Sequence, residues 1–559
     1  MAFNIADLFE RAVDAVGQRT ALVVGDEHLT FAEVEARANR LAHHLSAHGI
    51  GRGDHVGVHG QNSAEWLVAM MAAFKLRAVP VNINFRYVED ELLYLFDNAD
   101  LVALVHDRAF APRIAAVAPK LSGLRHLVAM PGPPPADDGD GYDDGAGAAA
   151  VDAAVAELGS VPFDAALADG SPARDFPQRS ADDHYVLYTG GTTGMPKGVV
   201  WRHEDVFFAL GGGIDAYTQQ RVTSEAELAE RAAASAAPLV SLSIPPLMHG
   251  AAQWSTLRAW FEGNTVVLLP RFRPHDVWAL IERERVNIAM ITGDAMGRPL
   301  IEALGEAPGR YDLSSLISVA SSAAVFSPTV KDRFHELLPG VLIVDAIGSS
   351  EGGHNGSVIV APGDTAMKGG GPTVSPGRDA VVLDDELRPV APGSGVVGRL
   401  ARSGNIPIGY YKDDAKTAAT FVVGADGRRY AVPGDFATVE ADGSITLLGR
   451  GSVSINSGGE KIFPEEVEAA LKAHPNVFDA VVVGVPDERW GSRVAAVVQP
   501  RDAASPPSLA DLDAHCRAHI AGFKVPRELH LVDHLVRSPA GKPDYTWAAG
   551  IAAAGRHRA

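Results

Sequence analysis

The most chemically informative stretch of this chain is segment 188–198, Tyr-Thr-Gly-Gly-Thr-Thr-Gly-Met-Pro-Lys-Gly, which follows a β-rich run. Glycine lets backbone N–H groups approach a polyanion closely, and threonine hydroxyls and a lysine ammonium add donors for phosphate oxygens. The segment differs from the common Gly-Lys-Ser/Thr phosphate loop, because Pro196 precedes Lys197 and Gly198 follows it. Its residue types predict a phosphate-binding loop, and the alternative is a simple Gly/Thr-rich turn.

Two further segments place carboxylates next to glycine turns. Asp345-Ala-Ile-Gly-Ser-Ser-Glu351 follows another β-rich run, and its last two residues offer a hydroxyl and a carboxylate, which suit a phosphate and its Mg²⁺ ion. Asp435 follows Pro-Gly, and a carboxylate there can accept two hydrogen bonds from a vicinal diol. Taken alone, the first segment is equally compatible with a turn that carries a solvated acidic residue, and the Gly-Asp at 434–435 is more simply interpreted as a turn.

A histidine and a lysine each stand in a segment that contains proline and glycine. His249 lies between two prolines and Gly250, and Lys542 follows Ser-Pro-Ala-Gly. Without further information, a structural histidine and an ordinary surface lysine are the simpler interpretations. No His/Asp/Glu grouping has convincing spacing for a metal site beyond Glu351.

Strand-like and helical patterns alternate along the chain and predict an α/β protein. The expected strands include 55–59, 265–269, 316–320 and 341–345, and the expected helices include 4–16, 66–74 and 274–285. Segment 131–150, with its Pro-Gly-Pro-Pro-Pro run and Asp/Gly repeats, predicts a surface loop or insertion. A second unit begins near residue 451, with expected helices at 464–472 and 509–520 and strands at 479–485 and 493–499, which indicates a compact α+β tail.

Bulk properties limit the classes of partner. The chain has 559 residues, 47% of them hydrophobic, and a formal net charge of −20. Such a charge disfavours nucleic acid and anionic membranes as partners. The one cysteine, Cys516, excludes an internal disulfide and a cysteine-based metal site. Without an export signal or an apolar run long enough to span a bilayer, the chain is expected to be cytoplasmic, with no integral membrane association.

The order Thr-x-Gly-Thr-Thr-Gly-x-Pro-Lys-Gly at 189–198 resembles the signature loop of the adenylate-forming superfamily. This superfamily includes acyl-CoA synthetases, luciferases and peptide-synthetase adenylation domains. The resemblance covers essentially the whole chain. It implies a large multi-layer α/β N-terminal adenylate-forming domain, residues 1–450, and a small mobile α+β C-terminal domain, residues 451–559.

The resemblance also implies roles for individual residues. Ser350 would contact the α-phosphate, Glu351 would hold Mg²⁺, His249 would lie beside the acyl carboxylate and the pantetheine channel, and Lys542 would bridge the carboxylate and the α-phosphate. The residues that it implies in nucleotide binding are Thr189, Gly190, Gly191, Thr192, Thr193, Gly194, Lys197, Ser322, Ala323, Ile347, Asp435, Arg450 and Lys542.

Three positions depart from the superfamily pattern. Ile347 stands where an adenine-stacking tyrosine is usual, Gly352 replaces a threonine, and Ser452 replaces the Asp or Lys of the usual hinge. A hinge needs only to absorb a change in φ and ψ, so serine is compatible with that role. With isoleucine at that position, the usual stacking of the adenine on a tyrosine is not expected.

Several runs resemble actinobacterial steroid side-chain CoA ligases of the 3-oxocholest-4-en-26-oate type. They are 82–88, 187–191, 201–205, 293–296, 404–407, 449–461 and 538–545. The resemblance implies that the chain uses ATP, Mg²⁺ and coenzyme A to convert a carboxylic acid, a steroid side-chain carboxylate, to its CoA thioester. The alternatives are a medium- or long-chain fatty acyl-CoA synthetase, a fatty acyl-AMP ligase, and a catalytically silent adenylate-binding protein. A homodimer is the assembly that we consider for the chain, and the sequence does not fix its oligomeric state.

Overall fold

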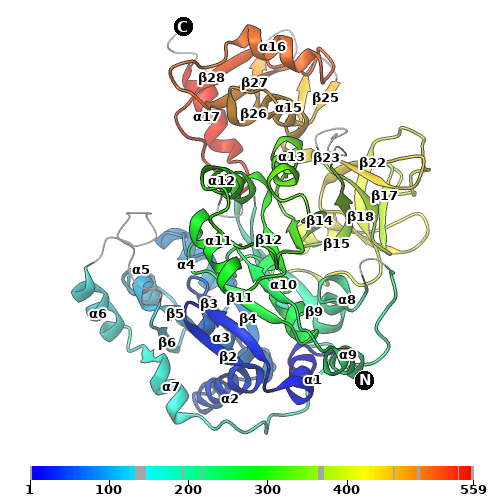
Figure 1. The fold of residues 1–559 in the computed structure, drawn as a ribbon. Helices are drawn as coiled ribbons and strands as arrows, with labels where there is room; N and C mark the ends of the chain where they lie inside the picture. Colours follow the sequence, from blue (N-terminus) through cyan, green and yellow to red (C-terminus); the bar gives the residue numbers. More distant parts are fainter. Residues whose placement is uncertain are drawn as a thin grey trace. The chain divides into compact units, whose positions relative to one another are not determined.

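The computed structural model describes residues 3–132, 147–191, 194–215, 218–362, 371–457, 460–487, 491–538 and 541–555 (Figure 1). Its residues form two compact units. Unit 1 comprises 1–290, 311–316 and 405–419, and unit 2 comprises 291–310, 317–404 and 420–559. Helices and strands alternate in unit 1 as the sequence predicts.

Unit 1 contains an eight-stranded sheet whose central strands are parallel. The strand order is β19 (Gly409–Tyr410), β9 (Gly194–Arg202), β8 (His184–Gly191), β4 (Val79–Ile83), β3 (His55–His59), β5 (Leu101–Asp107), β6 (His126–Met130) and β7 (Val161–Pro162). Strands β3 and β4 are buried at every position, as expected for parallel strands covered on both faces. A second run of strands has the order β2 (Glu27–Thr30), β1 (Thr20–Val24), β11 (Thr265–Leu268), β10 (Val240–Ser243) and β12 (Ile288–Ile291).

The helices of unit 1 begin in different ways, some of them with a side-chain cap. They are α1 (Ile5–Val16), α2 (Phe31–Ala47), α3 (Ala64–Lys75), α4 (Glu89–Asn98), α5 (Ala111–Val117), α6 (Ala148–Glu157), α7 (Phe163–Asp169), α8 (His203–Leu210), α9 (Ala226–Ala234), α10 (Gly250–Phe261) and α11 (Pro274–Arg283). Thr30 and Glu33 form a capping box at the start of α2, and Ser63 caps α3. Helix α6 begins within the predicted 131–150 loop, whose residues 133–146 lie outside the described ranges.

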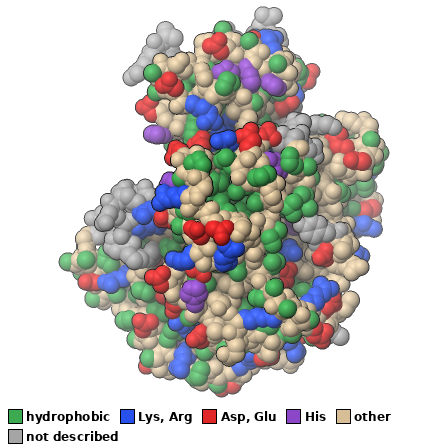
Figure 2. Space-filling view, viewed as in Figure 1, with side chains coloured by type: hydrophobic (Ala, Val, Ile, Leu, Met, Phe, Trp, Pro, Cys, Tyr) green, Lys and Arg blue, Asp and Glu red, His purple; other side chains and the backbone are tan. Residues whose placement is uncertain are grey.

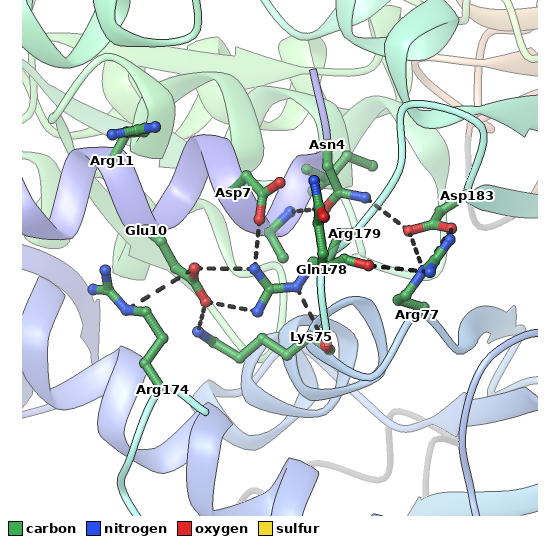
Figure 3. Close-up of polar contacts among 12 residues, drawn as sticks. Asn4, Asp7, Glu10, Arg11, Lys75, Arg77, Arg174, Gln178, Arg179 and Asp183 are labelled. Atoms are coloured by element: carbon green, nitrogen blue, oxygen red, sulfur yellow. Dashed lines mark hydrogen bonds and ion pairs between the residues drawn. The ribbon is translucent and has the colours of Figure 1, made fainter. Parts of the chain in front are cut away.

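A buried ion-pair network joins α1 and α3 to the segment 174–183 (Figure 3). The ammonium of Lys75, fully buried at the end of α3, lies 2.5 Å from Glu10 Oε1 and 3.1 Å from Glu35 Oε1. Arg179 Nη2 donates to Glu10 Oε1 at 2.8 Å, and Arg77 pairs with Asp183 at 2.7 Å. Each buried charge of this network therefore has a partner of opposite charge. Removing one residue would leave its partner with fewer compensating charges.

Unit 2 begins with α12 (Gly293–Glu306) and α13 (Pro328–Leu337) and continues as a mostly antiparallel sheet. Its strands run in the order β13 (Ser318–Ser321), β14 (Leu342–Ser349), β15 (Gly353–Val360), β16 (Thr373–Pro376), β23 (Ile445–Arg450), β22 (Asp435–Val439), β18 (Gly398–Arg402), β21 (Arg429–Ala431) and β20 (Phe421–Val423), and β17 (Ala380–Leu383) pairs with β18. The site residues on this sheet lie at strand ends: Ser322 and Ala323 follow β13, Ile347 lies near the end of β14, and Ser350 and Glu351 follow it. Arg450 ends β23 and Asp435 begins β22.

The last part of unit 2 is the expected α+β arrangement. A three-stranded sheet, β26 (Val477–Asp487), β27 (Gly491–Pro500) and β28 (Glu528–Leu531), accompanies α15 (Pro464–Lys472), α16 (Leu509–Arg517) and α17 (Tyr545–Gly555). Valines and alanines of β26 and β27 pack with Leu512 and Cys516 of α16 in one core cluster. Cys516 is buried there and contributes to the packing of this cluster.

On the face that Figure 2 shows, acidic and basic side chains are interspersed. Within the described ranges, every helix is too short or too polar to cross a lipid bilayer.

Candidate functional site

The predicted phosphate loop joins two antiparallel strands of unit 1. Strand β8 ends at Gly191 and β9 starts at Gly194, with Thr189 opposite Lys197 in the ladder. Thr192 and Thr193, at the tip, lie outside the described residues. The structure therefore places Thr189, Gly190, Gly191, Gly194 and Lys197 on one hairpin.

Lys197 has a specific partner in unit 1 that the sequence did not reveal. Its ammonium lies 2.7 Å from Asp413 Oδ2, and both side chains are partly exposed. Asp413 Oδ1 also accepts a hydrogen bond from the Lys416 N–H, at 2.9 Å. The hydrogen bond from Lys197 is the largest cause that lowers the pKa of Asp413. The lysine is thus held at the base of the loop by a carboxylate.

His249 is the N-cap residue of α10 and is partly buried. Buried side chains fix the segment before it: Leu247 N–H donates to Asn62 Oδ1 at 2.7 Å, and Gln253 Nε2 donates to the Leu247 carbonyl at 2.8 Å. A methyl group on Gly250 would lie 2.5 Å from the side chain of Leu187, so only glycine fits without a shift at this point. His249 is consequently set at a fixed position beside strand β8.

Asn82 connects the loop strand with the His249 segment, a role not predicted from sequence. Its Nδ2 donates to the carbonyls of Tyr188 at 2.8 Å and Met248 at 2.6 Å, and its Oδ1 accepts from the Tyr188 N–H at 2.8 Å. The side chain is buried at the end of β4. One amide therefore fixes the residues that immediately precede Thr189 and His249.

The segment 322–324 of unit 2, which consists of small residues, follows β13. Ser321 Oγ accepts a hydrogen bond from Gly293 N–H at 3.0 Å, and the next residue, Ser322, is partly buried. Ala323 is exposed and has φ of +70°, a left-handed conformation that is uncommon for alanine and is often found at functional sites.

Ile347, Ser350 and Glu351 lie at the end of β14 and in the turn before β15. Ile347 packs in a core cluster with Val374, Val382 and other apolar residues, and its side chain is 6% exposed. Ser350 and Glu351 are partly exposed, and the turn is closed by the Gly352 N–H, which donates to Ser349 Oγ at 2.9 Å. The turn thus leaves a hydroxyl and a carboxylate accessible beside the sheet.

Asp435 and Arg450 face each other across strands β22 and β23. They are register partners, and Arg450 Nε donates to Asp435 Oδ1 at 3.1 Å. Asp435 foremost raises the pKa of Arg450, and Glu351 and Glu465 add smaller contributions. The Arg450 N–H also points to Glu465 Oε1 at 3.4 Å. Burial, with a smaller contribution from Glu468, raises the pKa of Glu465 to about 8.

Lys542 follows a tight turn whose base is strongly fixed. Arg537 forms two 2.7 Å contacts with the carboxylate of Asp479 and donates from Nη1 to the Gly541 carbonyl at 3.0 Å. Ser538 closes the turn through two hydrogen bonds with Lys542: its Oγ accepts from the Lys542 N–H, and its own N–H donates to the Lys542 carbonyl. Gly541 has φ of +71°, which glycine adopts without strain.

The charges of four predicted residues of unit 2 influence one another. Burial lowers the pKa of the Lys542 ammonium, Arg450 lowers it further, and Glu351 and Asp435 oppose that decrease. Two cations and two carboxylates therefore share one partly buried region. The cations suit phosphate oxygens, and an accessible carboxylate such as Glu351 fits Mg²⁺, which usually takes one or two carboxylates together with substrate phosphates.

Comparisons with known proteins identify the family of the chain. A family model described as AMP-binding enzyme matches residues 9–411, and one described as AMP-binding enzyme C-terminal domain matches residues 466–542. The chain is 52% identical over 552 residues to 3-oxocholest-4-en-26-oate–CoA ligase of Rhodococcus rhodochrous, covering 98% of this chain and 96% of that protein.

Two further proteins are also similar to this chain over nearly its whole length. The chain is 53% identical over 548 residues to the medium/long-chain-fatty-acid–CoA/3-oxocholest-4-en-26-oate–CoA ligase of Mycobacterium tuberculosis (strain ATCC 25618 / H37Rv), covering 98% and 96% of the two chains. A crystal structure of the anthranilate CoA ligase AuaEII in complex with anthranoyl-AMP superposes with a TM-score of 0.81 and 25% identity, covering 99% and 98%. The resemblance in sequence and the expected fold, with a large N-terminal and a small C-terminal domain, are confirmed.

Proposed function

Because this chain belongs to the AMP-binding enzyme family and is an AMP-forming acyl-CoA ligase, we propose that the acid it activates is a steroid side-chain carboxylate. The observation that supports the substrate is the likeness at 52–53% identity, over nearly the full length, to ligases whose names include 3-oxocholest-4-en-26-oate. Medium- and long-chain fatty acids are the second candidate, since the name of the mycobacterial relative includes both.

The first half-reaction joins two anions and therefore needs positioned cations. The acid carboxylate attacks the α-phosphorus of ATP, a P–O bond breaks, and pyrophosphate leaves with its electron pair. We propose that Lys542 holds the carboxylate and α-phosphate together, with Ser350 donating to the α-phosphate. Positioning and charge stabilisation suffice, so no protein nucleophile is required. Mg²⁺ bound through Glu351 would neutralise phosphate charge.

The nucleotide is proposed to lie on the remaining residues. Lys197 and the 189–194 hairpin would bind the β- and γ-phosphates, and Asp435 would accept hydrogen bonds from the ribose hydroxyls while Arg450 keeps it oriented. Ser322 and Ala323 would lie along the edge of the adenine ring. Ile347 stands where an adenine-stacking tyrosine is usual, and it is proposed to lie near the base for that reason.

The second half-reaction replaces AMP by the thiol of CoA, which attacks the acyl carbon and forms the thioester. We propose that His249 lies beside the acyl carboxylate and the pantetheine channel. The predicted boundary between residues 450 and 451, the mobility of the small domain and the Ser452 hinge are part of the same proposal. Gly458 and Gly459, which we propose face the thiol channel once the small domain has rotated, lie outside the described residues.

A panel of acids tests the substrate. Pyrophosphate release would be measured with 3-oxocholest-4-en-26-oate and with straight-chain fatty acids, each with and without CoA. We expect the steroid acid to give the highest kcat/KM, with turnover dependent on CoA. Turnover with straight-chain acids alone would reject the steroid substrate, and accumulation of acyl-adenylate unaffected by CoA would indicate an acyl-AMP ligase. Absence of turnover with every acid would indicate a silent adenylate-binding protein.

A further inference from the structure

Three histidines of unit 1 bring their rings together outside the proposed ligase site. His44 lies in the last turn of α2, His48 directly follows that helix, and His126 is the first residue of β6. Their potential ligand nitrogens all lie within 4.8 Å of one another. Among the described residues, no other three histidine, cysteine or acidic side chains converge in this way.

The geometry of this histidine cluster, His44, His48 and His126, is close to that of a metal site. His44 Nε2 and His126 Nε2 are 3.0 Å apart, and the rings of His48 and His126 stack with centroids 4.0 Å apart. Zinc–imidazole bonds of about 2.0–2.1 Å at tetrahedral angles place ligand nitrogens about 3.3 Å apart. His48 is exposed, so its ring can move the remaining distance without disturbing the core.

The other contacts of the cluster orient the imidazoles. The Nδ1 atom of His48 lies 2.8 Å from the His44 carbonyl, so a proton on Nδ1 leaves Nε2 with its lone pair. Such a hydrogen bond from the second ring nitrogen is the usual support of a metal-binding histidine. His44 and His126 are nearly buried, at 3% and 7% exposure, and come from two different elements. The arrangement therefore has two fixed ligands and one adjustable ligand.

The charge state of the cluster also suits a metal ion. Burial lowers the pKa of His44 and, with smaller contributions from His48 and His44, lowers the pKa of His126 to about 4. Both rings are then neutral near pH 7, and neutral imidazole is the form that binds metal. The negative charge of Asp169 acts on His44 and favours a cation there. Arg125, beside His126, is engaged by the Gly49 carbonyl and Asp54.

We propose that His44, His48 and His126 form a site for a borderline divalent transition metal of the Zn²⁺, Co²⁺ or Ni²⁺ type, with water completing the coordination. Whichever of His44 and His126 carries its proton on Nε2 shifts it to Nδ1 through solvent, so both Nε2 lone pairs face the ion. The ion would link the end of α2 to the start of β6 and stabilise unit 1 by binding only the folded chain. The site is independent of the ligase proposal.

Cobalt titration of the purified, chelator-treated full-length chain tests this site, with the visible absorption of bound Co²⁺ as the readout and Zn²⁺ as competitor. We expect one ion per chain and about tenfold or more weaker binding in His48→Gln, which removes an exposed ligand and leaves the core intact. His43→Gln is the matched control, because His43 lies on the same helix but bonds to the Ala173 carbonyl and Asp175. Its affinity should equal that of the unmodified chain.

A second measurement guards against a variant that perturbs folding. X-ray absorption of the Zn²⁺-loaded chain should show three imidazole ligands, falling to two in His48→Gln. Another histidine group, His474, His515 and His519, has ring centroids 5.1 and 4.7 Å apart but does not converge its ligand atoms, so His519→Gln should leave both readouts unchanged. No stoichiometric Co²⁺ binding, or equal binding by the unmodified chain and His48→Gln, would overturn the proposal.

Discussion

Replacing Lys542 by alanine tests the proposed chemistry most directly. The lysine side chain lies near Arg450, Glu351 and Asp435, in a region where burial lowers its pKa. Removing one charge-stabilising donor from a site of this kind slows the chemical step by about 10²–10³-fold, or about 2.7–4 kcal/mol. We expect that loss in formation of the acyl-adenylate. Formation of the thioester from supplied acyl-adenylate should be spared, because that step no longer joins two anions.

The direction of the pKa shift gives a second, independent signature. The ammonium must be protonated to hold a carboxylate and a phosphate together, and a lowered pKa means that the proton is lost at a lower pH than for an ordinary lysine. The adenylation rate should therefore fall on the alkaline side through this lowered pKa. In Lys542→Arg the guanidinium stays charged, so this alkaline decrease should move to higher pH even if the overall rate is reduced.

Two assays separate the half-reactions: pyrophosphate release in single turnover for adenylation, and chromatography of the thioester made from synthetic acyl-adenylate. Lys524→Ala is the control, since Lys524 pairs with Glu466 in the same part of the chain. Equal losses in both half-reactions would refute the reasoning that Lys542 serves adenylation alone. An alkaline decrease unchanged in Lys542→Arg would remove Lys542 as its source.

Three further predictions concern stability and reactivity. Lys75→Met takes the buried ammonium from Glu10 and Glu35, which keep Arg179 and Arg174 as partners, and should reduce the free energy of unfolding by about 1–3 kcal/mol, measured as a lower urea midpoint; an unchanged midpoint would contradict the buried network. Glu465, with a pKa raised to about 8, keeps its proton in the folded chain where the unfolded chain has lost it, so it makes stability fall as pH rises from about 5 to 8. In Glu465→Gln this decrease, about 1.4 kcal/mol per pH unit, should disappear from denaturation midpoints. Burial raises the pKa of Cys516 to about 12, so a thiol reagent at pH 8 should label it only after unfolding; rapid labelling of the native chain would show that the thiol is accessible.

Local features of the fold could be predicted from the sequence because their signals are local. The predicted strand 55–59 coincides with β3, and the predicted helix 464–472 coincides with α15. Other boundaries differ by a few residues: the helix expected at 509–520 ends at Arg517. Helix α6 was missed because its first residues continue a low-complexity run with no polar N-cap, and Gly147 provides no side-chain cap.

The candidate site could be predicted one motif at a time, whereas the contacts between motifs could not. Arg450 and Asp435 were each identified, but their ion pair depends on the register of β22 and β23. Asn82 gave no separate signal, because its contacts with Tyr188 and Met248 span more than a hundred residues. The His44–His126 contact is similarly distant in sequence, and only the spacing of His44 and His48 hints at a shared helix face.

Asp413, the partner of Lys197, shows why such a distant contact matters for the proposed function. A partly exposed ion pair of this kind contributes only about 0–1 kcal/mol, so it orients the lysine without binding it strongly. A triphosphate offers several charged oxygens to the same ammonium, and charge-assisted hydrogen bonds to them are stronger than neutral ones. Phosphate can therefore replace Asp413 at little cost. The carboxylate keeps the Lys197 side chain beside the hairpin. The entropic cost of ordering this long side chain is therefore already met before ATP binds.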